Sequence, residues 1–229
     1  MTSTPTASGQ DRHYYGIMVL CLAGLLAVAA SAFLLPDTES HFYTGESGPV
    51  QIFSAAAYLT VVVALARETS HTFLFRHFYF VLIPVAMCLR ELDFHNLLTS
   101  MSITKTSFYL SSEVPLLEKL LAVAIYAALI WAGVMVLLRH GKGFLAGLRQ
   151  GRAYAVAISL SGFLAVASKT IDGIARKLAP FGVTIPMEMQ QISVVVEEVM
   201  ELGIPLFFLV AVFAFFSRAE NAATEGPFR

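Results

Sequence analysis

Long apolar stretches alternate with short polar segments along the whole chain. Each apolar stretch is close to the about 20 residues that a helix needs to cross a bilayer. The pattern predicts an all-α, polytopic membrane protein: one domain over residues 1–229, built as a bundle of six transmembrane helices. We expect polar, disordered tails at 1–13 and 218–229. The six spans are expected at about 14–35, 49–67, 75–91, 115–138, 153–172 and 187–217.

The composition supports this class of protein. Hydrophobic residues make up 57% of the chain and charged residues only 14%, and the mean hydropathy is +0.71. Soluble domains have about 45–50% apolar and about 25% charged residues. The spans occupy so much of the 229 residues that no room is left for a separate soluble domain.

Lysine and arginine predict the orientation, because cytoplasmic loops carry an excess of them. With the N-terminus in the cytoplasm, nine of the fifteen fall on that side. The segment RHGKGFLAGLRQGR at 139–152 is the clearest marker, with four cations and no acid. We therefore expect both termini in the cytoplasm. Twelve of the sixteen acids fall on the other side, which indicates a polar site that opens to the non-cytoplasmic face.

The sixth apolar stretch contains three glutamates, Glu197, Glu198 and Glu201, within VVVEEVMELGIP. An ionisable group in hydrocarbon costs about 3 kcal/mol on insertion scales, so such groups are rare and often functional. Pro205 also leaves the carbonyl of Glu201 without its helical donor. Carboxylates beside a free carbonyl suit a cation. Three carboxylates this close need a metal ion, a facing Lys or Arg, or bound protons.

The fifth apolar stretch ends in SKTIDGIARKL, which brings cations to the same end of the bundle. Ser168, Asp172 and Arg176 follow one another at intervals of four, so we expect them to share a face. Lys169 lies three residues before Asp172. Two interpretations remain open: local Lys169–Asp172 or Asp172–Arg176 ion pairs, or pairing with the glutamates of the sixth stretch.

The third apolar stretch ends in CLRELDFH, a candidate metal-binding segment. Glu91 and His95 share a face if the helix persists that far, whereas Asp93 points elsewhere on it. Carboxylates and an imidazole can hold a divalent ion such as Zn or Mn, with Glu198 as a further ligand. The alternative is an interfacial ion pair with Arg90 or with a neighbouring helix.

Two more segments border this region. Gln51, Ser54 and Tyr58 form a polar stripe on the second stretch, which indicates hydrogen bonding between helices. The loop NLLTSMSITKTSFYLSSEVP mixes apolar residues with Ser, Thr and Lys105, which is typical of an interfacial segment or a lid. Lys105 reaches either the lipid headgroups or the acidic site.

Several other kinds of site are disfavoured. The histidines considered for haem, at 13, 77, 95 and 140, lie at the ends of spans, which argues against a b-type haem between helices. Nothing resembles a phosphate-binding glycine loop, HExxH, GxSxG or a CxxC pair. No basic, aromatic-interleaved stretch indicates nucleic-acid binding.

The motifs CLRELDFH, TKTSFY, SKTIDGIARKL and EEVMELGIPLFF resemble those of a group of bacterial multi-pass inner-membrane proteins, over about residues 46–210. This resemblance implies a location in the bacterial cytoplasmic (inner) membrane and brings no reaction with it. A looser similarity exists to the intramembrane metal hydrolases of the alkaline ceramidase and adiponectin-receptor group. The chain departs from that group because it has six predicted spans instead of seven. It also lacks the group's second-helix histidine and the paired histidines of its last helix.

Three functions are consistent with these features. The first is a metal-dependent hydrolase or transferase that acts on a lipid. Its metal ligands would be Glu91, Asp93, His95 and Glu198. Its catalytic residues would be Glu201, Glu197, Lys169, Asp172, Arg176 and Lys105.

The second function is a proton- or cation-coupled transporter, with the three glutamates of the sixth stretch as the cation site. The third is a structural or sensor membrane protein in which every charge is paired. The apolar sequence after Glu201, PLFFLVAVFAFF, argues against a path through the membrane. The expected partners are the lipid bilayer and a lipid substrate, with no nucleic acid, and the chain length does not define the oligomeric state.

Overall fold

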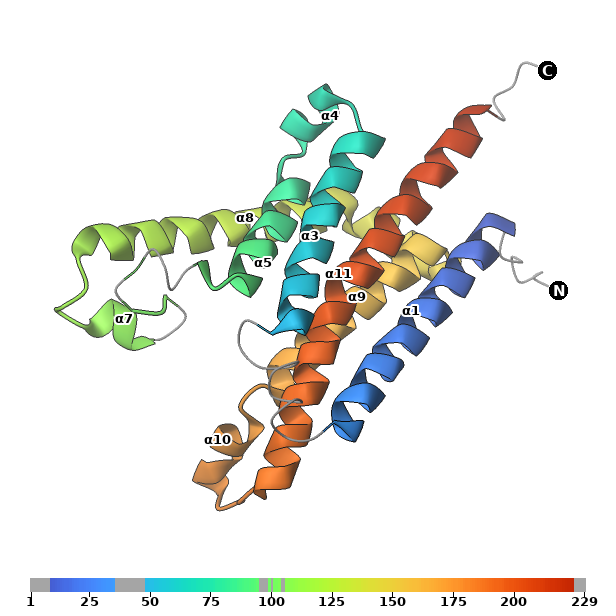
Figure 1. The fold of residues 1–229 in the computed structure, drawn as a ribbon. Coiled ribbons are helices and arrows are strands. Elements are labelled where there is room, and N and C mark those ends of the chain that lie inside the picture. Colours follow the sequence, from blue (N-terminus) through green and yellow to red (C-terminus); the bar gives the residue numbers. More distant parts are fainter. Residues whose placement is uncertain (1–8, 36–47, 95–98, 100, 104–105, 225–229) are drawn as a thin grey trace.

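The chain folds into helices, which confirms the all-α class. The computed structural model describes residues 9–35, 48–94, 99, 101–103 and 106–224, the last seven of these as backbone only, and no strand occurs among them. The elements in chain order (Figure 1) are α1 (Gly9–Leu34), α3 (Pro49–Glu68), α4 (His71–Arg76), α5 (Tyr79–Glu91), α7 (Thr106–Leu110), α8 (Leu116–Arg149), α9 (Ala153–Ile171), α10 (Ile174–Leu178), the 3₁₀ helix η1 (Ala179–Phe181) and α11 (Met187–Thr224).

Helix α11 is the centre of the bundle. It packs most extensively on α9, and then on α3 and α1 (Figure 1). In its most apolar stretch 61% of the residues are buried, against 11% in the corresponding stretch of α8. Helix α3 in turn packs on α5, and α5 packs on α8. The core therefore follows α11, and the outer helices expose their apolar side chains.

Within the described part of the chain, five helices are long and apolar enough to cross a membrane: α1, α3, α8, α9 and α11. Many of their Leu, Val and Phe side chains are exposed. Exposed apolar surface on this scale marks contact with lipid or with another apolar partner. Because a helix also satisfies its own backbone hydrogen bonds, these elements are compatible with hydrocarbon. The fold is that of an integral membrane protein.

The expected span at 75–91 is divided into two helices. Helix α4 ends at Arg76 and α5 begins at Tyr79. His77, between them, leaves the helical conformation, with φ −125° and ψ 35°. Helix α5 has only 13 residues, fewer than the about 20 that cross the hydrocarbon in one piece. Two polar residues, Arg76 and His77, stand at this break, and the expected span ran through them.

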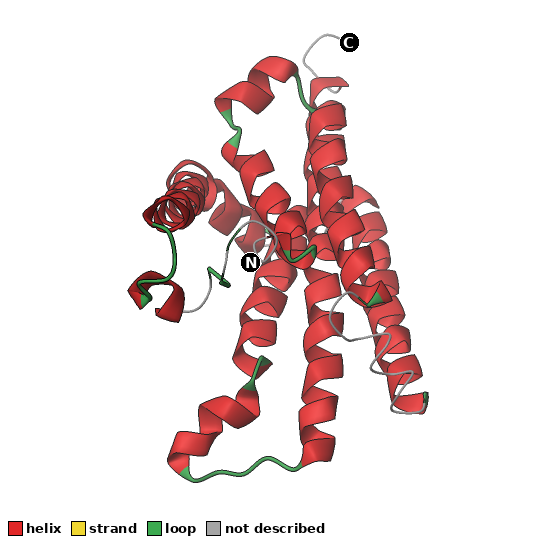
Figure 2. Cartoon of the chain, turned by 60° about the vertical axis from the view of Figure 1, so that its left-hand side comes forward, coloured by secondary structure: helices red, strands yellow, loops and turns green. Residues whose placement is uncertain are grey.

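Helix α8 differs from its expected span in length and in direction. It continues to Arg149, so most of the basic segment 139–152, expected as a loop, is helical. In Figures 1 and 2, α8 lies across the direction of α3, α5 and α11. Its buried residues are Ala122, Ala132 and Gly147. Most of its apolar surface is therefore available to lipid.

Helices α1 and α11 extend into the segments expected as tails, to Gly9 and Thr224. The buried side chain of Asp11, in the first turn of α1, contacts the start of α9. Its Oδ1 accepts a hydrogen bond from the backbone N–H of Ala153 at 3.0 Å, and its Oδ2 lies 3.4 Å from Nη1 of Arg152. The first N–H groups of a helix lack partners within that helix. Asp11 thus caps α9 from a different helix.

Small residues let α9 and α11 approach each other closely. A Cβ atom on Gly203 of α11 would lie 2.6 Å from Cδ1 of Leu164 on α9. Oγ of Ser161 on α9 donates a hydrogen bond to the carbonyl oxygen of Ile204 at 2.9 Å. Small residues and interhelical hydroxyl bonds are typical of helix pairs in membranes. The contact holds the glutamate-bearing part of α11 against α9.

Replacing Ser161 with Ala should lower the free energy of unfolding by about 0.6 kcal/mol, and by at most about 1.7 kcal/mol, because the bond between α9 and α11 is lost. Ser159→Ala is the matched control, since Oγ of Ser159 donates to a carbonyl of its own helix. Unfolding by SDS in mixed detergent micelles measures both variants. An equal loss in the two would contradict a contribution from the interhelical bond.

Candidate functional site

Glu201 is the centre of a charged region where α5, α9 and α11 meet. Its side chain is only 6% exposed. Its Oε1 accepts hydrogen bonds from Nη2 of Arg90 at 2.5 Å and lies 2.9 Å from Nζ of Lys169. Arg90 is near the end of α5 and Lys169 near the end of α9. One carboxylate on α11 therefore connects three helices.

Further carboxylates surround this bridge. Nζ of Lys169 lies 3.6 Å from Oε1 of Glu197 and 3.4 Å from Oδ2 of Asp172. Glu198 is within electrostatic range of both Glu91 and Glu201. We use the name charged cluster for this set: Arg90, Lys169, Glu91, Asp172, Glu197, Glu198 and Glu201. Two cations face five acids, so the cluster has a surplus of negative charge when all of its groups are ionised.

Two buried polar atoms beside the bridge lack a hydrogen-bond partner among the described residues, namely Oε1 of Glu91 and the hydroxyl of Tyr58. Glu91 is 4% exposed and Tyr58, on α3, is 1% exposed. Nη2 of Arg90 lies 3.9 Å from Oε1 of Glu91, but this nitrogen already donates to Glu201. An unpaired buried polar group costs about 1–3 kcal/mol. A bound proton or cation would remove that cost at Glu91.

The polar stripe on α3 behaves differently at each position. Nε2 of Gln51 donates to Oδ2 of Asp93 at 3.4 Å, which confirms a hydrogen bond between segments. Oγ of Ser54 donates a hydrogen bond to the carbonyl oxygen of Val50, in its own helix, at 3.0 Å. The prediction that Ser54 donates a hydrogen bond to another helix was therefore wrong. Asp93 follows the end of α5 with a left-handed backbone, φ 49°.

The shared face predicted for Ser168, Asp172 and Arg176 is wrong, because α9 ends before Asp172. Gly173 has φ 58°, the left-handed conformation that commonly ends helices. The guanidinium of Arg176 turns back over this glycine, with Nη2 2.9 Å from the position of an added Cβ. The local Lys169–Asp172 ion pair, one of the two interpretations, is present. Lys169 also reaches the glutamates of α11, so both interpretations hold for it.

The predicted metal ligands are only partly brought together. Glu91 and Glu198 are in the charged cluster, whereas Asp93 accepts a hydrogen bond from Gln51. His95, and the predicted catalytic Lys105, lie outside the described residues. Within the described part of the chain, no group of three His, Cys, Asp or Glu side chains is placed to hold a metal ion. A complete ligand set therefore stays a prediction.

Sequence reasoning gave too little weight to two residues. Arg90 was considered only as a partner for its own segment, although its main contact is Glu201, 111 residues later. The available signal was an arginine in an apolar stretch, which needs an acid from another helix. Tyr58 was seen only as part of a polar stripe, and no sequence signal shows that its hydroxyl is unpaired.

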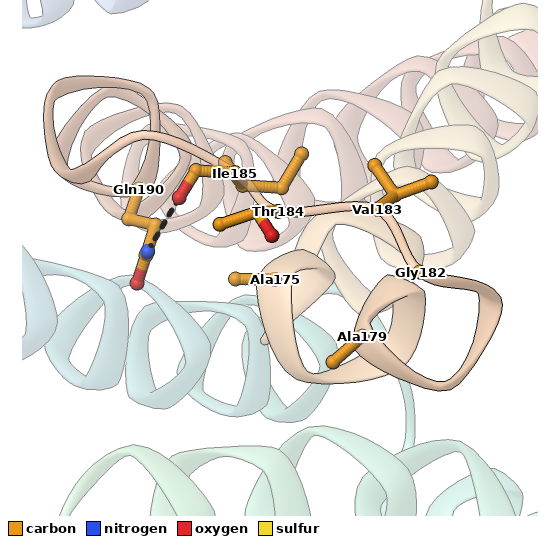
Figure 3. A pocket seen from close by; sticks show the side chains of 7 residues that line it. All are labelled: Ala175, Ala179, Gly182, Val183, Thr184, Ile185 and Gln190. Carbon is orange, nitrogen blue, oxygen red and sulfur yellow. Dashed lines mark hydrogen bonds between the residues drawn. The ribbon is translucent and has the colours of Figure 1, made fainter.

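A shallow open pocket of 260 Å³ lies beside the start of α11. Nε2 of Gln190 donates to the carbonyl of Ile185 at its edge, at 2.9 Å (Figure 3). The pocket contains no ionisable side chain among its lining residues, so the candidate chemistry belongs to the charged cluster. The lining residues come from α10, η1, the segment that leads into α11 and the first turn of α11: Ala175, Ala179, Gly182, Val183, Thr184, Ile185 and Gln190.

Comparisons with protein-family models, with curated proteins and with solved structures each give no match. The resemblance to the bacterial inner-membrane group therefore stays a prediction, and the function has to be argued from the site itself.

Replacing Glu201 with Gln should lower the free energy of unfolding by about 3 kcal/mol, because two cations lose their shared counter-ion. This value is at the low end for a buried pair, since the side chain of Lys169 is 47% exposed. Glu68→Gln is the matched control: Glu68 is half-buried but its partner, Arg67, is exposed, and the two charges are 4.0 Å apart, so the loss of this pair should cost less than about 1 kcal/mol. Denaturant titration of both variants in detergent measures the difference, and similar losses would contradict the bridging role.

Proposed function

We propose that this integral membrane protein binds a small cation or a proton in the charged cluster, from the non-cytoplasmic side. The observation that carries the proposal is the buried Oε1 of Glu91, which has no hydrogen-bond partner among the described residues and lies beside a surplus of acids. The polypeptide crosses the membrane six times in this proposal, with α4 and α5 together as the third crossing and both termini in the cytoplasm.

The charge balance favours a positively charged ligand. Arg90 and Lys169 both bind Glu201 directly, so their charge is shared first with that carboxylate. Glu91 and Glu198 are left with little compensation. A carboxylate taken out of water has to be protonated, or it has to be paired with a cation. The hydroxyl of Tyr58 offers one more oxygen ligand at the same place.

The distribution of polar groups favours access from one side. Beyond Glu201, α11 continues with buried apolar residues, among them Leu202, Ile204 and Phe207. A carrier needs polar groups on both sides of its site in order to release the ion across the membrane. A one-sided site supports a sensor or an enzyme in preference to the transporter that the glutamates alone suggest.

A metal-dependent lipid hydrolase or transferase is the second candidate. It is favoured by the approach of Glu91 on α5 to Glu198 on α11, with Arg90 and Lys169 beside them. A divalent ion such as Zn or Mn would lie between the two glutamates. Glu197 would act as general base, and the cations would hold a phosphate of the lipid.

Cation binding should raise the melting temperature of the purified protein, because a ligand at 100 times its Kd adds about 2.7 kcal/mol of stability. We expect the shift with one of Na⁺, K⁺, Mg²⁺, Ca²⁺, Mn²⁺ or Zn²⁺, and its loss in Glu91→Gln. Glu188→Gln is the matched control, since Glu188 is an exposed acid in the first turn of α11, the helix of Glu197, Glu198 and Glu201. It should keep the full shift.

If the ligand is a proton, no metal cation shifts the melting temperature. The infrared difference spectrum of wild type minus Glu91→Gln should then contain the carbonyl band of a protonated carboxyl group. Absence of both signals contradicts the proposal. Zinc or manganese that co-purifies with the wild type, and is lost in both Glu91→Gln and Glu198→Gln, would select the metalloenzyme.

A further inference from the structure

A second group of polar side chains lies at the opposite end of α5 from the charged cluster. His77 precedes α5, Tyr79 begins it, and His140 lies on α8. Tyr79 and Glu91 are the two ends of this helix, so about 18 Å separates them at 1.5 Å per residue. The ring centroids of the two histidines are 6.0 Å apart, and Tyr79 is 5.7 Å from His77 and 6.0 Å from His140.

The hydrogen bond of His77 defines its tautomer. Nδ1 lies 3.1 Å from the carbonyl oxygen of Phe73. A carbonyl can only accept, so Nδ1 carries the hydrogen in the neutral ring and Nε2 keeps its lone pair. The stacked ring of Phe73, at 4.2 Å between centroids, fixes the plane of the imidazole.

His140 has the complementary arrangement. Its Nε2 lies 3.0 Å from the hydroxyl of Tyr79. A tyrosine hydroxyl can accept as well as donate. When Nε2–H donates to Tyr79, the lone pair is on Nδ1. Metal-binding histidines usually donate their second ring N–H in this way, to a carbonyl or another acceptor, which orients the ring and raises its basicity.

We propose that His77 and His140 form a transition-metal site, with Nε2 of His77 and Nδ1 of His140 as ligands and copper as the preferred ion. Imidazole is a ligand for copper, zinc, iron and nickel, and in the divalent series the affinity for nitrogen ligands is highest for copper. The carbonyl of Phe73 and the hydroxyl of Tyr79 would orient the two ligands.

The surroundings agree with this choice of ion. Phe80 packs against both imidazoles, at 6.5 Å from His77 and 4.8 Å from His140, which gives the pair an apolar wall. The guanidinium of Arg139 lies 5.9 Å from the ring centroid of Tyr79. Hard ions such as Mg²⁺ and Ca²⁺ need several oxygen ligands, which two imidazoles do not supply. The donor set therefore favours ions that bind nitrogen strongly.

The single tryptophan of the chain is a natural reporter for this site. Trp131 stacks on Phe78 at 5.1 Å and lies 6.1 Å from Tyr79, between ring centroids. Titration of the purified protein with Cu²⁺, buffered by glycine, should quench its fluorescence with saturation at one equivalent. His77→Gln and His140→Gln should each abolish the saturable phase, and Tyr79→Phe should weaken binding by about 10- to 100-fold.

His71→Gln is the matched control, because His71 is an exposed histidine only six residues before His77. It should keep the wild-type titration, as should Glu91→Gln, which separates this site from the charged cluster. The electron paramagnetic resonance spectrum of the wild-type copper complex needs no variant to fold, and it should show two nitrogen ligands. Quenching that survives both histidine substitutions, or a spectrum without two imidazole nitrogens, would overturn the proposal.

Discussion

The low polarity of a membrane makes the Glu201 carboxylate the point on which the rest of the site depends. An isolated charge in the hydrocarbon is unfavourable in free energy, so each charged side chain needs a partner of opposite charge when its helix is in the membrane. Glu201 partners Arg90 and Lys169 at once. This arrangement fixes the ends of α5 and α9 against α11. It also leaves Oε1 of Glu91 buried without a hydrogen-bond partner among the described residues.

Local patterns were sufficient to predict the individual helices. Apolar runs of suitable length located α3 and α9 to within one residue, because length and apolarity are the conditions for crossing hydrocarbon. They also located α1 and α11, although α1 begins five residues before its expected start and α11 ends seven residues after its expected end. The same patterns gave Glu197, Glu201, Lys169 and Asp172 as members of one site, since acids and cations in apolar surroundings must pair.

Features that depend on the backbone conformation of one residue could not be predicted. Arg176 was misplaced because Gly173 takes a left-handed conformation and ends the helical spacing. The break at His77 likewise depends on the backbone of one residue, which leaves the helical conformation between Arg76 and Tyr79. The role of Arg90 depends on a contact between residues 111 positions apart, and one sequence contains no signal that pairs them.

The cap that Asp11 provides for α9 has a consequence for the order of assembly. Asp11 and Ala153 are separated by 142 residues. At synthesis rates of about 5–20 residues per second, α1 waits about 7 to 28 seconds for the helix that it caps. During that time α1 has to be stable alone in lipid. This requirement agrees with an apolar stretch, residues 14–34, that contains no Asp, Glu, Lys, Arg or His, whereas α9 and α11, which reach the membrane beside helices that are already inserted, can carry lysine and glutamate.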